Sequence, residues 1–344
     1  AEGGVLVTMA DRSRLPAPRP GPAFRFPVVQ RQALGNGLRV WTVEHRDLPV
    51  LSFVLLLRSG SADDPADREG LAALTADMLD EGSDGRSALE IEDALSRLGA
   101  QMDTEVGADA SVLSLITLSR YRDAALDLLA EIAARPRFDP AELDRVRDLR
   151  LTRLRQMRDV APAVADRMLA RLLYPGHPYG HFPLGVTQAL KAASAGDVSA
   201  FHAQAWHPSR LTLIAVGDGT HDELVAAAER AFGWWAPGGP PREETPPPPA
   251  PASPGPRLAV IDRPGAAQTE LRIGLVAVPR VTPDYHALIV LNAILGGQFV
   301  SRLNLNLREA KGFTYGVRSG FDFRRGPGPF IVQAAVQPAA TAES

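Results

Sequence analysis

The sequence of 344 residues contains no cysteine, which excludes disulfide bonds and metal sites built from thiolates. It also lacks an unbroken run of about 18 apolar residues, so we expect no membrane span. The net charge is only −3, and lysine and arginine are scattered among the acids without a basic stripe. We therefore expect no nucleic-acid partner. The pair Gly296-Gly297 opens no G-x-G-x-x-G motif, so a nucleotide site is unsupported.

Hydrophobic residues make up 45% of the chain, which is enough for a large core and more than one domain. The first residue is alanine and no signal peptide is visible, although Met9 is a possible start. These features favour the cytoplasm, or the periplasm if a leader was removed.

Composition divides the chain into four parts. Residues 1–27 are rich in proline and arginine and form an expected extended arm. Residues 28–236 alternate strand and helix patterns and form a first domain. Residues 237–256 are half proline and predict a stiff linker without a core. Residues 257–344 form a second domain.

The second domain repeats the pattern of the first. Its strand at 330–336 mirrors the strand at 112–118, with Val332 lying 219 residues after Leu113. Two further expected strands, at 258–261 and 271–278, mirror those at 38–43 and 50–57. Because the first copy continues to residue 236 and the second stops early, we expect a truncated second domain. The repeat unit is a whole domain with strands and helices, which predicts an α+β fold.

Residues 302–316, RLNLNLREAKGFTYG, read as an amphipathic helix that ends at Gly312 and runs into a strand. Arg308 lies on the helix and Tyr315 on the strand. Both side chains can donate hydrogen bonds to one oxygen, as in the binding of a peptide carbonyl or a developing oxyanion. The alternative is a solvated arginine and a core tyrosine.

The segment LREAKGFTYGV, preceded by ILGGQFVSRL, resembles the second-half signature of the pitrilysin/insulinase family of zinc metallopeptidases, which includes the mitochondrial processing peptidases. The resemblance implies two homologous domains in tandem, each a sheet covered by helices, forming half of a clam-shell. It also implies that Arg308 and Tyr315 bind the substrate backbone beside a zinc ion held by the other half or subunit.

The same family holds zinc with a His-x-x-Glu-His helix and a distant glutamate. Histidines at i and i+4 reach one metal, and the glutamate between them acts as general base. In this sequence the frame GLAALTADM, residues 70–78, has Ala73 and Asp77 at the histidine positions and Ala76 at the glutamate position. Arg153 aligns with the distant glutamate. We therefore expect no zinc in this chain and no activity from it alone.

The resemblance favours a non-catalytic, substrate-binding subunit of a heterodimeric zinc peptidase. Its partner would be a homologous chain that carries His-x-x-Glu-His and the zinc, and its ligand a peptide substrate. One alternative is an inactive scaffold or peptide-binding protein of the same fold. Another is a peptidase with a displaced zinc site at His177 and His181, although Pro178 and Gly180 between them indicate a loop.

Overall fold

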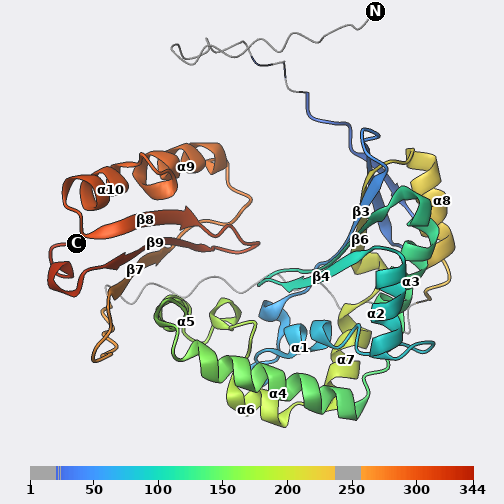
Figure 1. Ribbon diagram of the computed structural model, residues 1–344, viewed down its shortest axis with the longest axis horizontal. Helices are drawn as coiled ribbons and strands as arrows, with labels where there is room; N and C mark the ends of the chain where they lie inside the picture. The colour runs from blue at the N-terminus through green and yellow to red at the C-terminus, as the bar shows by residue number, and fades with distance from the viewer. Residues whose placement is uncertain (1–20, 22, 24, 237–256) are drawn as a thin grey trace, which may run out of the picture.

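The computed structural model describes residues 21, 23, 25–236 and 257–344. It contains two sheets, each accompanied by helices, which confirms the α+β class (Figure 1). Most of the expected arm and the whole expected linker at 237–256 lie outside the described residues.

The first sheet has six strands in the order β1-β2-β6-β3-β5-β4. Only the β2–β6 pair is parallel. The central strand β3 alternates half-buried and fully buried residues along its length, because one of its faces carries the core. The strands are β1 (Gln30–Ala33), β2 (Arg39–Glu44), β3 (Val50–Leu57), β4 (Gln101–Val106), β5 (Ser111–Leu118) and β6 (Leu211–Gly217).

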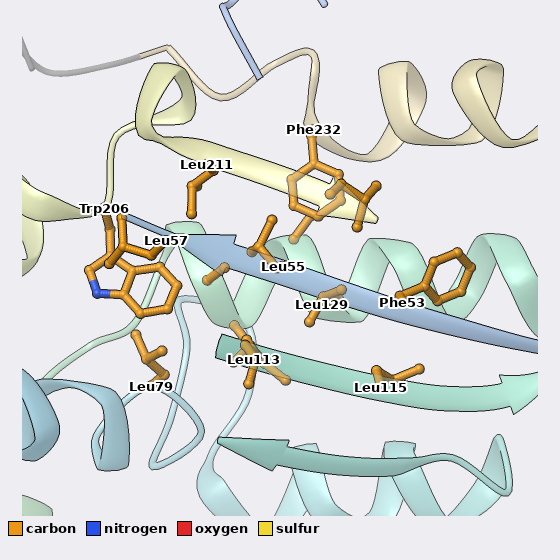
Figure 2. Close-up of a cluster of buried hydrophobic side chains, with 14 of the residues drawn as sticks. Phe53, Leu55, Leu57, Leu79, Leu113, Leu115, Leu129, Trp206, Leu211 and Phe232 are labelled. Atoms are coloured by element: carbon orange, nitrogen blue, oxygen red, sulfur yellow. The ribbon is translucent and has the colours of Figure 1, made fainter. Parts of the chain in front are cut away.

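Helices surround this sheet and bury its apolar face. Figure 2 shows Phe53 and Leu55 of β3 and Leu115 of β5 in one buried cluster with helical side chains such as Leu129 and Phe232. The helices are α1 (Leu71–Asp77), α2 (Ala88–Arg97), α3 (Arg122–Ala134), α4 (Pro140–Met157), α5 (Ala161–Leu173), α6 (Thr187–Ala192), α7 (Ala195–Ala205) and α8 (His221–Phe232).

The second sheet is antiparallel, in the order β7-β9-β8, and it has a small core of Leu307, Val317, Ala334 and Val336. Its elements are β7 (Thr269–Val276), α9 (Tyr285–Asn292), η5 (Ala293–Gly297), α10 (Arg302–Asn304), η6 (Leu305–Ala310), β8 (Thr314–Phe321) and β9 (Pro329–Val336). Helix α9 is apolar and yet has no buried residue.

The prediction of a strand at 258–261 is wrong. These residues form no strand, and Leu258 is 90% exposed. The corresponding strand of the first sheet, β2, is held between β1 and β6. The described second sheet has three strands and offers no such pair of neighbours, so the apolar pattern alone does not form a strand there.

One stretch of the described residues, Tyr285–Ala310, is long and apolar enough to span a membrane by length and composition. Extended backbone at Gln298 and Ser301 divides it into two helical pieces. Each piece is shorter than the ~20 residues that a spanning helix needs. The absence of a membrane span therefore stays a prediction.

The turn between β8 and β9 contacts the first domain. The Tyr179 hydroxyl donates to Asp109 (2.9 Å) and accepts from the Gly326 backbone N–H (2.8 Å). The Tyr174 hydroxyl donates to the Pro327 carbonyl (2.9 Å). These bonds, which we call the hairpin contact, fix the second sheet against the loop at residues 174–181.

Candidate functional site

Helix α1 carries the positions that the resemblance assigns to zinc. Its first residues are held by Asp64, whose carboxylate accepts from the Gly70 and Ala72 backbone N–H groups, each at 2.7 Å. Burial raises the pKa of Asp64 to about 7, against the opposing effect of these two donors. Gly70 has φ +99°, a left-handed conformation that favours glycine. The start of α1 is therefore fixed by the Asp64 carboxylate and by Gly70, and by none of the residues at the zinc positions.

The residues at those positions do not fit zinc. Ala73 and Ala76 are buried methyl groups without a donor atom. The Asp77 carboxylate forms an ion pair with Arg150 of α4, and Arg150 also donates to the Pro183 carbonyl (2.7 Å). Arg153, one turn further along α4, is an exposed cation. An arginine therefore occupies the place next to Asp77 that a metal would need.

His177 and His181 form hydrogen bonds with different partners. The buried His177 accepts from the Tyr179 backbone N–H (3.0 Å), and its ring packs on Tyr174 and Tyr179. His181 Nδ1 lies 3.1 Å from the Ser61 carbonyl oxygen. No group of three or more potential metal ligands occurs among the described residues. These contacts argue against a displaced zinc site.

Arg308 lies in η6, a π-helical segment, rather than in the regular helix expected from the sequence. Its guanidinium stacks on the Phe299 ring at 3.8 Å and lies 3.3 Å from the Glu309 carboxylate. Its Nη1 atom is buried and makes no hydrogen bond within the described residues. π-Helical turns often occur at functional sites, because the extra residue redirects side chains.

Tyr315 is held outward by a β-bulge. Thr314 pairs with Val336 and Val317 pairs with Ala334, so β8 uses one more residue than β9 over this interval. The bulge leaves the Tyr315 side chain 93% exposed. The prediction of a core tyrosine, the alternative interpretation, is therefore wrong. Among the contacts of the described residues, none joins Arg308 to Tyr315.

Asn304 connects these two elements and was not identified from the sequence. Its side-chain amide donates to the Val317 carbonyl (2.8 Å), and its amide oxygen accepts from the Val317 N–H (2.9 Å). Asn304 lies one turn before Arg308, and Val317 lies two residues after Tyr315. The available signal in the sequence was an asparagine between Leu303 and Leu305.

Two sheets with flanking helices, a helix at 71–77 in the place of a metal-binding helix, and an arginine–tyrosine segment define a metallopeptidase-like half. Family models agree with this architecture. Residues 39–182 match the insulinase model of peptidase family M16, and residues 192–344 match the peptidase M16 inactive domain.

Individual relatives give the same result. A solved structure of a peptidase M16 inactive domain from Pseudomonas fluorescens is 30% identical, with a TM-score of 0.81, and the match covers 92% of this chain and 77% of that one. An uncharacterized zinc protease of Mycobacterium tuberculosis is 29% identical over 90% of this chain and 70% of its own length. The mouse mitochondrial-processing peptidase subunit beta is 25% identical over 88% of this chain and 61% of its own length.

The chain belongs to peptidase family M16, the pitrilysin/insulinase family, and is a non-catalytic member with a degenerate His-x-x-Glu-His motif.

Proposed function

We propose that this chain is the non-catalytic, substrate-binding subunit of a heterodimeric zinc peptidase. Its partner is a homologous chain that carries His-x-x-Glu-His and the zinc ion. This chain forms one wall of the substrate chamber, and Arg308 and Tyr315 hold the scissile peptide at the partner's metal.

The observation that carries the proposal is a contrast between α1 of the first domain and the Arg308–Tyr315 segment of the second. In the first domain, Asp77, which lies at one of the zinc positions, forms an ion pair with Arg150. In the second domain, Tyr315 is exposed beside a bulge that Asn304 borders, and the only charged partner of Arg308 among the described residues is Glu309, the next residue along the chain. Tyr315 is exposed, and Arg308 is held by Phe299 and by its ion pair with Glu309, so both side chains are positioned where a ligand can reach Tyr315 from outside.

The second domain exposes an apolar surface. Large apolar side chains are exposed on α9 and in the segment that follows it, including Ile289, Val290, Leu291, Phe299 and Val300. Apolar surface of this kind packs against further protein, which is either a partner or the additional length that the matched relatives have. A scaffold without substrate is the alternative, because it would need the same interface but not Arg308 or Tyr315.

Affinity purification of the full-length chain from its native cell tests the proposal, with an assay for chelator-sensitive cleavage of a quenched peptide. We expect a homologous His-x-x-Glu-His chain at one-to-one stoichiometry, together with activity. A chain that purifies alone and inert would support the scaffold. A chain that purifies alone and active, with bound zinc, would contradict the account of the vacated site.

A further inference from the structure

An apolar cavity of about 270 Å³ lies between the end of α4, the length of α5 and the loop at Phe182. Its apolar lining comes from two methionines, an aromatic ring and three aliphatic side chains, which are Leu154, Met157, Ala163, Val164, Met168 and Phe182. Three arginines, Arg158, Arg167 and Arg171, complete the wall. The cavity wall thus combines apolar side chains with three cationic residues.

The positive charge is only partly compensated. Arg171 forms an ion pair with the buried Glu69. The half-buried Arg167 lies over the Phe182 ring at 5.3 Å, and its guanidinium donates to the Gly185 carbonyl at 3.5 Å. No ion pair within the described residues involves Arg158 or Arg167. Burial lowers the pKa of Arg167; Glu69 opposes this, and Arg171 and Arg158 reinforce it. Two cations are therefore available for an anionic ligand.

The cavity lies near Arg150, the partner of Asp77. Leu154 lies about one helical turn after Arg150 on α4, and the Pro183 carbonyl next to Phe182 accepts from Arg150. The Phe182 N–H donates to the Glu69 carboxylate (2.8 Å), which fixes this wall. The cavity therefore lies close to the Asp77–Arg150 pair.

The size of the cavity limits what it can bind. Sites for drug-sized molecules measure roughly 300–1,000 Å³, so this cavity suits one large side chain rather than a long acyl chain. Arginine binds carboxylates in a two-point geometry, which favours a carboxylate placed directly beside that side chain. Only the last residue of a peptide carries its main-chain carboxylate next to its side chain.

We propose that this cavity binds the C-terminal residue of a peptide, with a large apolar side chain inside and the free α-carboxylate on Arg158 and Arg167. The inference rests on the proposed function for its biological role, because it names the substrate class held by this wall. The binding itself requires only this chain.

Fluorescence anisotropy of the full chain with labelled peptides tests the inference. One peptide ends in leucine with a free carboxylate, a second is its C-terminal amide, and a third ends in serine. We expect the first peptide to bind and both changes to weaken binding at least tenfold. Arg167→Gln should weaken binding of the first peptide by a similar factor. Arg97→Gln, at an exposed arginine paired with Asp93 on α2, is the matched control and should leave binding unchanged.

Equal binding of the acid and the amide would overturn the inference, as would full binding by a folded Arg167→Gln variant. Competition by decanoate without any binding of the leucine peptide would assign the cavity to a fatty acid and overturn it too. Loss of peptide binding in Arg167→Gln, with partner capture unchanged, separates this inference from the proposed function. A chain that captures no partner but binds the leucine peptide would leave the cavity assignment intact.

Discussion

Asp77 carries the remaining carboxylate at the vacated zinc positions, and Arg150 neutralises it. Arg150 is buried, whereas the Asp77 side chain is 43% exposed. A buried guanidinium without its carboxylate would keep only the bond to the Pro183 carbonyl. The pair therefore has a structural role at the point where relatives of this family place a metal.

Asp77→Ala should reduce the free energy of unfolding by about 1–3 kcal/mol, because it removes a hydrogen bond between charged groups. Adding Arg150→Met should recover part of this loss, because no buried charge is then left unpaired. Urea unfolding of both single variants and the double variant measures the coupling. The exposed pair Arg97–Asp93 is the control and should give about 0–1 kcal/mol. Additive effects of Asp77→Ala and Arg150→Met would contradict the assignment.

His202 gives a prediction for pH. It is buried against Trp206 and Phe138, with Nε2 2.9 Å from the Ala133 carbonyl oxygen. Burial lowers the pKa of His202 from 6.5 to about 4. The folded protein therefore keeps His202 neutral while the unfolded chain takes up a proton below pH 6.5. The contribution of His202 to stability is present above that pH and falls as the pH drops toward 4.

His202→Gln should be less stable than the wild type at pH 7, and the difference should shrink by about 3 kcal/mol by pH 4, at 1.36 kcal/mol for each pKa unit. Burial raises the pKa values of Asp64 and Asp80 to about 7 and 6, so these groups increase the stability as the pH falls, opposite to His202. Both proteins share this effect, and comparing them at each pH removes it. Chemical unfolding at several pH values measures the difference. A difference that stays constant from pH 7 to 4 would refute a neutral His202.

At the scale of elements, the second domain depends on how η6 meets β8. Asn304 bonds both backbone groups of Val317, next to the bulge that exposes Tyr315. The bulge and the π-helical turn each add a residue to a regular pattern. Tyr315 is exposed at the bulge, and Arg308 is half-buried in the π-helical segment.

Asn304→Ala should leave the Val317 N–H and C=O buried without their partner, at a cost of roughly 1–3 kcal/mol for each group. We expect faster amide hydrogen exchange at residues 314–318 and loss of Tyr315-dependent activity in the complex. Asn306→Ala, on the exposed side of the same segment, is the control. Unchanged exchange at the bulge in Asn304→Ala would show that Asn304 does not hold it.

The sequence allowed the regular elements to be predicted better than the irregular ones. The strands expected at 50–57 and 112–118 match β3 and β5 to within one residue. The strand at 258–261 was wrong, because pattern does not say whether neighbouring strands are present. The bulge near Tyr315 depends on a bond between residues 13 positions apart, which no local pattern records.

At the scale of the molecule, the hairpin contact joins the two domains through few polar groups. The Tyr179 hydroxyl accepts a hydrogen bond from the Gly326 N–H. The Asp109 carboxylate accepts from both the Tyr179 hydroxyl and the Arg325 N–H (2.7 Å). Arg272 of β7 pairs with Asp166 of α5 elsewhere on the same boundary. The segment HPYGH at 177–181, first considered as a metal site, thus contributes to domain packing.

Tyr179→Phe should weaken the coupling between the domains by about 1–3 kcal/mol, because the buried Gly326 N–H loses its acceptor. Hydrogen exchange in residues 322–328 should rise while exchange in the first sheet stays unchanged. Tyr121→Phe, at the junction of β5 and α3, serves as control. Equal protection of the hairpin in the wild type and Tyr179→Phe would contradict this role for the tyrosine.

The most direct test of the account is the turnover of the reconstituted complex with Tyr315→Phe. Loss of one oxyanion-type donor typically costs about 3–4 kcal/mol, so kcat should fall roughly 100-fold or more while assembly with the zinc-bearing partner persists. Tyr285→Phe, at the start of α9, should keep the wild-type rate. A Tyr315→Phe complex that retains most of its activity would contradict the claim that this chain completes its partner's active site.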